Sequence, residues 1–219
     1  MQNNINSKYT GIEELLTLEL MKNYNNSIVK DSIKFSTKSK TVVDFGAGIG
    51  TLSMIFRENY KKEPICVEID KTNIKYLKER KFKCFKNLKS LEEPVDLIFS
   101  SNVLEHIKND YQILSEIRKK LKEDGTLFLY VPAKMILWSK LDESVGHYRR
   151  YEISKLRALC KKSGFKIAKI HYADCIGFFL TLLWRYLNIS RNTLPSKKAL
   201  FFYDKYISPV SRFLDNLGF

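Results

Sequence analysis

The segment from Thr41 to Gly50, with the sequence TVVDFGAGIG, constrains the fold of this chain more than any other. Thr41 to Phe45 is a short run of β-branched and aromatic residues, a pattern typical of a buried strand. Three glycines follow, and a helical pattern begins directly after them. Glycine permits the positive φ angles of a tight turn and lets a ligand approach the backbone. The segment therefore predicts a strand, a binding turn and a helix N-terminus; a tight turn without a ligand is the alternative.

The spacing of these glycines indicates which class of ligand the turn could bind. A dinucleotide turn has the pattern G-x-G-x-x-G, whereas Gly46, Gly48 and Gly50 form G-x-G-x-G. Asp44 places a carboxylate at the strand end, where it would repel a phosphate and attract an ammonium group. The pattern resembles the S-adenosylmethionine site of class I methyltransferases, whose ligand carries an amino-acid moiety and no phosphate. The same spacing argues against a nicotinamide-dependent oxidoreductase.

A second carboxylate follows the next predicted strand, which runs from Pro64 to Ile69. Glu68 lies 22 residues after Gly46, the spacing at which a carboxylate at a strand tip accepts hydrogen bonds from ribose hydroxyls. Asp70 is expected to cap the helix that follows. The glycine turn together with Glu68 is much more specific than the turn alone.

Strands alternate with helices along the rest of the core. Further strands are predicted at 82–85, 96–100 and 126–131, a helix at 111–121, and a sixth strand at 166–172. The absence of a hairpin signal among the first five strands predicts an α/β fold with a doubly wound, mostly parallel sheet. Ligands bind outside the carboxyl ends of the strands in such sheets.

Polar residues follow the third and fourth predicted strands at this edge. Ser101 and Asn102 come directly after the fourth strand, before VLEHI, where a helix is expected to begin. Asn87 is expected to hydrogen-bond the adenine edge while Leu88 covers the ring face. Simple turn chemistry at Asn87 and Leu88 is an equally good interpretation.

Several later segments sharpen the resemblance. SSNVLEHI at 100–107, KKLKEDGTLFLYVPA at 119–133, GHYRRY at 146–151 and SGF at 163–165 resemble one subgroup of class I methyltransferases, whose members also share an upstream NYN like that at 23–25. The resemblance spans roughly residues 8–175, and this subgroup is often associated with glycan or glycolipid assembly. Two features depart from it: Asn87 stands where an acidic residue is usual, and the chain ends without the usual final antiparallel strand.

Methyl transfer to a hydroxyl or amine requires alignment of the nucleophile and a base that takes its proton. His147 is the expected base, because it lies in a long connection, residues 133–151, that should cover the carboxyl edge as a lid. Its neighbours Arg149 and Arg150 are expected to clamp a phosphate or carboxylate of the substrate. The alternative is that these residues pin the lid through hydrogen bonds to Asp142, Glu143 or the backbone. His106 is the alternate base or a packing residue.

Other chemistries are disfavoured by missing motifs. No DPPY-type or NPPY-type tetrad and no Pro-Cys pair follows the fourth strand, which argues against methylation of DNA bases. No cysteine or histidine spacing typical of a metal site is present, so no metal is expected.

The segments on either side of the core are expected to be helical. A preface (1–40) has helices at 11–21 and 27–35 separated by the turn-forming cluster NYNNS at 23–27, after a polar start at 1–10. An extension (173–219) has an apolar segment at 176–187 and an amphipathic one with aromatic and basic residues at 199–217. A helical cap on the core or a dimer face is the favoured interpretation, and a surface for a membrane or lipid-linked substrate through 176–214 is the alternative.

Composition sets the remaining bounds. The 219 residues suit a single domain, and the net charge of +14 favours phosphate-bearing partners, or else reflects a lysine-rich surface. Four cysteines without paired spacing, a polar N-terminus and no apolar run long enough to span a bilayer predict a cytoplasmic protein, with peripheral membrane contact as an alternative.

The sequence thus predicts a methyltransferase that uses S-adenosylmethionine and releases S-adenosylhomocysteine. The acceptor is expected to be a small molecule, with O-methylation of a sugar or lipid-linked sugar favoured. A non-catalytic S-adenosylmethionine-binding or scaffold protein and a nucleic-acid methyltransferase are the alternatives. The residues expected to contact the cofactor are Tyr24, Asp44, Gly46, Ala47, Gly48, Gly50, Glu68, Ile69, Asn87, Leu88, Ser101 and Asn102.

Overall fold

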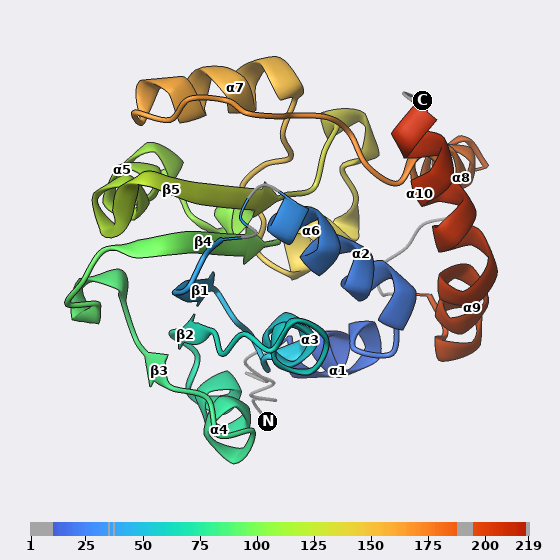
Figure 1. Ribbon diagram of the computed structural model, residues 1–219. Helices are drawn as coiled ribbons and strands as arrows, with labels where there is room; N and C mark the ends of the chain where they lie inside the picture. The colour runs from blue at the N-terminus through green and yellow to red at the C-terminus, as the bar shows by residue number, and fades with distance from the viewer. Residues whose placement is uncertain (1–10, 35, 37, 188–194, 218–219) are drawn as a thin grey trace, which may run out of the picture.

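The computed structural model describes residues 11–34, 36, 38–187 and 195–217. Figure 1 shows a central sheet with helices on both faces and a group of C-terminal helices at one end. The sheet has five parallel strands in the order β3-β2-β1-β4-β5. The predicted doubly wound α/β fold is therefore confirmed. The strand order reverses between β1 and β4, so their carboxyl ends mark the point where such sheets bind ligands.

The five predicted strands are all present. Asp44 in β1 lies between Cys66 of β2 and Phe99 of β4, which fixes the register of the centre of the sheet. The strands are β1 (Val42–Phe45), β2 (Ile65–Val67), β3 (Cys84–Phe85), β4 (Val95–Ser101) and β5 (Leu121–Tyr130).

Helices of very different length precede, connect and follow these strands. The α-helices are α1 (Ile12–Leu18), α2 (Lys22–Lys34), α3 (Thr51–Tyr60), α4 (Lys71–Glu79), α5 (Asp110–Lys120), α6 (Lys140–Ser144), α7 (Ile153–Lys162), α8 (Cys175–Tyr186), α9 (Lys197–Phe202) and α10 (Ser208–Leu217). Shorter turns are η1 (Leu88–Ser90), η2 (Leu104–His106), η3 (Met135–Leu137) and the π-helical η4 (Tyr203–Ile207). Asp70 caps α4 as predicted, because its side chain accepts hydrogen bonds from the N–H groups of Thr72 and Asn73.

Successive side chains of each strand point to opposite faces of the sheet, so a hydrophobic core forms on each face. Val43 and Ile98 pack in a cluster with Leu114 of α5 and Cys160 of α7, whereas Val42, Leu97 and Phe99 pack with residues of α2 and α3. Each strand is therefore covered on both faces, which explains the nearly continuous apolar runs in the sequence. The four cysteines are free thiols.

Two predicted elements of the core are wrong. VLEHI forms only the single turn η2, and α5 begins later, at Asp110. Residues 166–172 form no strand. Ile167 packs against the core and the Tyr172 hydroxyl donates to Glu152, so side-chain contacts rather than a backbone ladder hold that segment.

The predicted turn at 23–27 is also wrong, because this cluster lies inside α2. The first N–H groups of the helix are satisfied by a distant residue. Asp204 of η4 accepts hydrogen bonds from the backbone N–H groups of Asn23 and Tyr24, at 3.1 and 2.8 Å. A tertiary cap thus replaces the local turn that the asparagines would otherwise favour. The polar start at 1–10 and the end of the second predicted helix lie outside the described residues.

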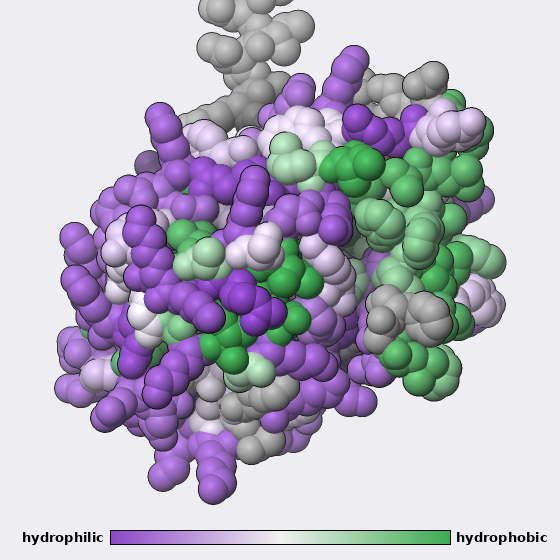
Figure 2. All heavy atoms as spheres, turned by 90° about the horizontal axis from the view of Figure 1, so that it is seen from above, coloured by the Kyte–Doolittle hydropathy of each residue, from purple (hydrophilic) through white to green (hydrophobic). Residues whose placement is uncertain are grey.

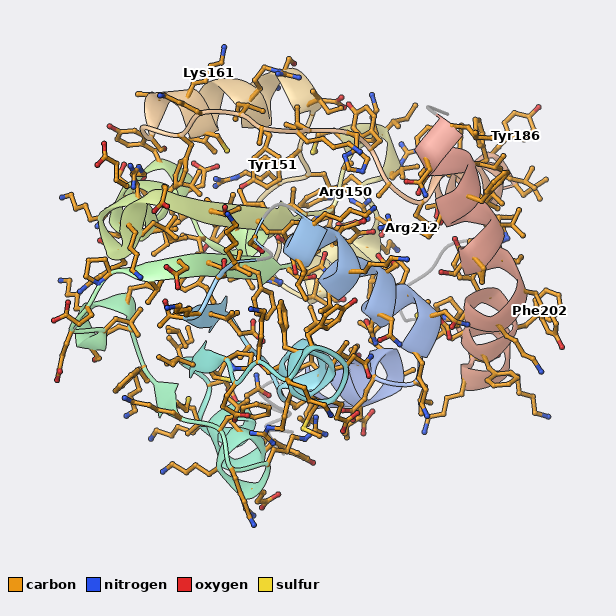
Figure 3. The ribbon with its side chains drawn as sticks, in the orientation of Figure 1. Arg150, Tyr151, Lys161, Tyr186, Phe202 and Arg212 are labelled. Atoms are coloured by element: carbon orange, nitrogen blue, oxygen red, sulfur yellow. The ribbon has the colours of Figure 1, made fainter. Side chains whose placement is uncertain are left out.

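The C-terminal helices lie beside α2 (Figure 1). Arg212 of α10 forms an ion pair with Asp31 of α2, and Figure 3 shows its side chain between the two helices. Asp215 of α10 accepts hydrogen bonds from the N–H groups of Asp174 and Cys175, which join α8 to α10. One side of the extension therefore packs as a cap. Among the described residues, no helix is long and apolar enough to cross a membrane.

Candidate functional site

The glycine turn joins β1 to α3 at the carboxyl edge. Gly46, Gly48 and Gly50 have φ angles of 77°, 54° and 86°, values that side chains with a Cβ rarely adopt. A Cβ at Gly46 would lie 2.2 Å from Cγ2 of Val103, in the loop after β4. The N–H groups of Gly46 and Ala47 both donate to the carbonyl of Val67, so the turn is held against the end of β2.

Glu68 is buried beside this turn. Its Oε2 accepts a hydrogen bond from the N–H of Gly48 at 2.8 Å, and its Oε1 accepts from the N–H groups of Ile69 and Asp70 at 2.7 and 2.9 Å. The carboxylate is therefore fixed by three backbone donors, with acceptor capacity left for a ligand. The side chain of Ile69 is 81% exposed, an apolar surface directly beside Glu68.

Asp44 lies beneath the turn rather than at its surface. It is 3% exposed, and its Oδ2 accepts a hydrogen bond from the Ser53 hydroxyl at 2.7 Å. Burial raises the pKa of Asp44 to about 7, opposed by the Ser53 hydrogen bond and reinforced by the negative charge of Glu68. A nearby cation would restore its charge, so Asp44 can favour an ammonium group through its field.

Asn87 and Leu88, after β3, form the simple turn that was one of the two interpretations from sequence. The Asn87 carbonyl oxygen accepts hydrogen bonds from the N–H and hydroxyl of Ser90, which caps η1. Leu88 is buried in the core cluster of α5 and α7. Asn87 itself is exposed.

The end of β4 and the start of α2 meet at the other side of the edge. Ser101 ends β4, and Asn102 has a φ of 53° and donates its backbone N–H to the Tyr130 carbonyl. The hydroxyl groups of Tyr24 and Tyr130 lie 2.9 Å apart and connect α2 to the end of β5. Burial raises the pKa of Tyr24 to about 12, so its hydroxyl stays protonated.

The two ends of the segment 133–151 lie side by side. Ala133 and Tyr151 form a parallel bridge, in which the Tyr151 N–H donates to Pro132 and the Lys134 N–H donates to Tyr151. The segment contains η3 and α6 between these ends. The Tyr148 N–H donates to the carbonyl of Glu105, which fixes the segment against the loop after β4.

His147 is oriented by a carboxylate. Its Nδ1 lies 2.8 Å from Oδ1 of Asp142, a residue that is 2% exposed. Burial alone would raise the pKa of Asp142, but hydrogen bonds from His147 and Arg150 hold that pKa well below its usual range. Asp142 is therefore ionised and accepts the Nδ1 proton of His147, which fixes the orientation of the imidazole ring.

Both arginines of the GHYRRY segment are engaged within the chain. Arg150 donates from Nε and Nη2 to the two oxygens of Asp142 at 2.8 and 3.1 Å, while its Nη1 donates to the Ala133 carbonyl. Arg149 is 2.5 Å from Oδ2 of Asp110 and donates to the Lys108 carbonyl. This geometry matches the interpretation in which these residues pin the segment 133–151 through hydrogen bonds to Asp142 and the backbone, not the predicted clamp on a substrate.

The turn η2 brings Glu105 and His106 to the same place. The rings of His106 and His147 meet edge to face, with 4.6 Å between centroids. Nε2 of His147 is 3.8 Å from Oε1 of Glu105. Partial desolvation, and secondarily the neighbouring His147, hold the pKa of His106 below its usual value.

Sequence reasoning missed Glu105 and Val103. Glu105 is fully buried, and burial raises its pKa to about 8. The one available signal was the Glu-His pair in VLEHI, but the partner His147 comes from a segment 41 residues later than His106. Only the fold reveals that these side chains converge.

Comparisons with known proteins agree with this architecture. A family described as "Methyltransferase domain" matches residues 19–170. A relative from Papaver somniferum, (S)-coclaurine N-methyltransferase, is 28% identical in a match that covers 41% of this chain and 29% of that protein. The chain therefore spans under a third of the length of that relative.

Solved structures share the fold at low identity. A SAM-dependent methyltransferase from Archaeoglobus fulgidus is 20% identical with a TM-score of 0.54, covering 74% of this chain and 86% of that one. A SAM-dependent methyltransferase from Thermotoga maritima is 18% identical with a TM-score of 0.56, covering 71% and 77%. The mitomycin 7-O-methyltransferase MmcR is 19% identical with a TM-score of 0.53, covering 72% and 52%. With the family match over more than half of its residues, the chain belongs to the methyltransferase domain family, which uses S-adenosylmethionine.

Proposed function

We propose that this chain transfers the methyl group of S-adenosylmethionine to an oxygen of a small-molecule acceptor, with a sugar or lipid-linked sugar favoured. The observation that carries the proposal is the Asp142–His147 pair beside the carboxyl edge, in which Nδ1 of His147 lies 2.8 Å from Oδ1 of Asp142. Support for a small acceptor comes from the related (S)-coclaurine N-methyltransferase and the similar fold of mitomycin 7-O-methyltransferase, whose names specify small molecules.

The cofactor is proposed to lie across the ends of β1 and β2. The glycine turn, Gly46 to Gly50, is proposed to lie against its methionine end, whose ammonium group is favoured by the field of Asp44. Glu68 accepts the ribose hydroxyls with its remaining lone pairs, and the exposed Ile69 packs against the adenine ring. Ala47 belongs to the same turn. Asn87 is proposed to reach the adenine edge through its amide, with Leu88 supporting the turn from the core.

The other side of the cofactor is proposed to face β4 and α2. Ser101 and Asn102 line the reacting edge, where β4 ends. Tyr24 is proposed to close the site from α2, since its hydroxyl reaches the end of β5 through Tyr130.

The reaction is an in-line displacement at the methyl carbon. The acceptor oxygen forms a bond to that carbon, the carbon–sulfur bond breaks, and its electron pair leaves with S-adenosylhomocysteine. The acceptor hydroxyl gives its proton to Nε2 of His147, and Asp142 stabilises the imidazolium that results. Arg149 and Arg150 are proposed as positioning residues, because their ion pairs with Asp110 and Asp142 hold the lid that carries His147.

The preference for a lipid-linked acceptor rests on the outer side of the C-terminal helices, here called the apolar face. It consists of large exposed side chains: Phe179, Leu183, Tyr186, Phe201, Phe202, Tyr206, Val210, Phe213 and Leu217. Figure 2 shows hydrophobic residues gathered on this part of the molecule, while the rest of that view is mostly hydrophilic. Figure 3 shows Tyr186 and Phe202 pointing away from the core.

Charge and position indicate an anionic bilayer as the occupant of the apolar face. Lys197, Lys198 and Lys205 are exposed beside its aromatic residues, and the whole chain has a net charge of +14. Basic residues around an apolar surface are typical of interfacial binding. Arg185 of α8 donates to the Trp138 carbonyl after η3, so this face adjoins the lid. A membrane-bound acceptor would thereby reach the carboxyl edge.

The decisive experiment combines cofactor binding with turnover. We expect S-adenosylhomocysteine to bind with micromolar affinity and NAD not to bind, and labelled methyl groups to pass to sugar or lipid-linked sugar acceptors. Cofactor binding without transfer to any acceptor of these classes would favour a scaffold protein. Transfer to RNA or DNA instead would establish the nucleic-acid alternative.

A further inference from the structure

Glu105 has no hydrogen-bond partner for either carboxylate oxygen among the described residues, and its exposure is 0%. Burying an ionised carboxylate without compensation costs considerable free energy, so such a group is either protonated or has a counter-charge or a metal ion. The guanidinium of Arg150 directs its hydrogen bonds to Asp142 and Ala133 instead. The mechanism proposed above gives Glu105 no task.

Two imidazoles face this carboxylate. One ligand atom each from Glu105, His106 and His147 lies within 4.8 Å of the others, and the distance from Nε2 of His147 to Oε1 of Glu105 is 3.8 Å. Ligands at about 2.1 Å from a shared ion lie about 3 to 4 Å apart, so small side-chain adjustments bring all three to bonding distance.

Asp142 prepares His147 for coordination. Its carboxylate accepts a hydrogen bond from Nδ1, so Nε2 lies on the other side of the ring, 3.8 Å from Oε1 of Glu105. A carboxylate that fixes the tautomer of a histidine in this way is the usual second partner of a metal-bound imidazole. Asp142 is itself held by Arg150 and by the Ser139 N–H, which keeps the arrangement rigid.

We propose that Glu105, His106 and His147 bind a divalent transition-metal cation in the loop after β4. Two imidazoles and one carboxylate suit Zn²⁺, Mn²⁺, Fe²⁺ or Co²⁺, whereas Mg²⁺ and Ca²⁺ prefer sites made entirely of oxygen. Three protein ligands leave at least one coordination position open. The two segments that supply them are joined by the Tyr148–Glu105 backbone hydrogen bond, so the site is built into the contact between lid and core.

A cation here would change how the acceptor loses its proton. Its coordination of an acceptor hydroxyl lowers the pKa of that hydroxyl, as metal ions do for bound water. That hydroxyl would then lose its proton to solvent rather than to Nε2 of His147, and its oxygen would attack the methyl carbon. In the metal-free protein, Nε2 of His147 is free to act as the base. This placement of the acceptor rests on the proposed function, whereas binding of the cation does not.

The test is a titration of the full chain after removal of metal by chelation. Co²⁺ is followed by its visible absorption, and Zn²⁺ and Mn²⁺ by calorimetry. We expect one ion per chain, with affinity reduced at least tenfold in Glu105→Gln and in His106→Ala. His171→Ala, which changes the one histidine outside the cluster, is the matched control and should bind as the wild type does. No binding of any of the three ions by the stripped wild type, or unchanged binding by the two cluster variants, would overturn the proposal.

Folding and function are separated within the same experiment. His106 is exposed, so His106→Ala is expected to keep its circular dichroism and melting temperature even if Glu105→Gln does not. S-adenosylhomocysteine is titrated into each preparation. Cofactor binding without cation binding overturns this inference and leaves the proposed function intact. Cation binding without cofactor binding overturns the proposed function and leaves this inference intact.

Discussion

The N–H of Gly48 donates a hydrogen bond to Oε2 of Glu68, with 2.8 Å between nitrogen and oxygen. This contact joins the glycine turn after β1 to the end of β2. The other oxygen of Glu68 receives two more backbone N–H groups. One side chain therefore both shapes the turn and presents its remaining acceptor capacity at the edge of the sheet.

Replacing Glu68 should weaken cofactor binding through both effects. We expect Glu68→Ala to reduce the affinity for S-adenosylhomocysteine by about 10- to 100-fold, since it removes the ribose acceptor and releases the N–H of Gly48. Glu68→Gln should have an affinity between those of the wild type and Glu68→Ala, because an amide keeps only one accepting oxygen. Calorimetric titration measures both. Glu93→Ala, an exposed carboxylate before β4, is the control; if Glu68→Ala bound as tightly as this variant, Glu68 would have no place in the site.

Gly46 should tolerate no side chain. Gly46→Ala combines a positive φ with a Cβ 2.2 Å from Val103 Cγ2, and we expect a loss of about 2 kcal/mol or more in the free energy of unfolding. Chemical denaturation measures this loss. The double variant Gly46→Ala/Val103→Ala should regain the part of the free energy of unfolding that is lost to the steric clash, but not the part that is lost to backbone strain. A double variant no more stable than Gly46→Ala would exclude the clash as a cause.

The sequence predicted most of the sheet edge because its signals are local. The glycines, Glu68, Ser101 and Asn102 each follow a short apolar run, and a parallel sheet brings such positions together without further information. The sequence failed where distant residues decide the structure. Asp204 caps the start of α2, and residues 166–172 are held by side chains. Glu105 and His147 meet only because the segment 133–151 packs against the loop after β4.

Asp44 should make stability depend on pH. Its pKa is about 7 in the folded chain and about 3.9 in an unfolded one. Between these values the folded state binds the extra proton, so the free energy of unfolding should decrease as the pH rises from about 4 to 7. Asp44→Asn should remove this contribution. Urea denaturation of both proteins from pH 5 to 8 gives the difference, and parallel curves would show that Asp44 ionises normally.

His147 should matter for turnover and little for cofactor binding. We expect His147→Ala to lower kcat about 10²- to 10⁴-fold, whether the imidazole acts as a base or as a ligand, because Nε2 faces the cluster after β4. The affinity for S-adenosylhomocysteine should stay within about twofold, since the cofactor is proposed to lie on the glycine turn and Glu68. Single-turnover transfer of labelled methyl groups measures the first effect. Full activity in His147→Ala would remove the residue from the mechanism.

The apolar face should bind anionic bilayers. Tyr186 and Phe202 are 84% and 56% exposed on the outer side of α8 and α9, and Lys205 lies over the rings of Phe201 and Tyr206 at 5.7 and 5.2 Å. In co-sedimentation with phosphatidylglycerol vesicles, we expect Tyr186→Ser and Phe202→Ser each to reduce binding about 5- to 10-fold, since each removes apolar area from the bilayer. Tyr111→Ser changes an aromatic residue of α5 with 41% exposure and should have no effect.

Higher salt should weaken binding of the wild type to the vesicles, because salt screens the charges of the lysines. Equal binding by all four proteins would show that the bilayer contacts another surface, and the preference for a lipid-linked acceptor would then lose its support.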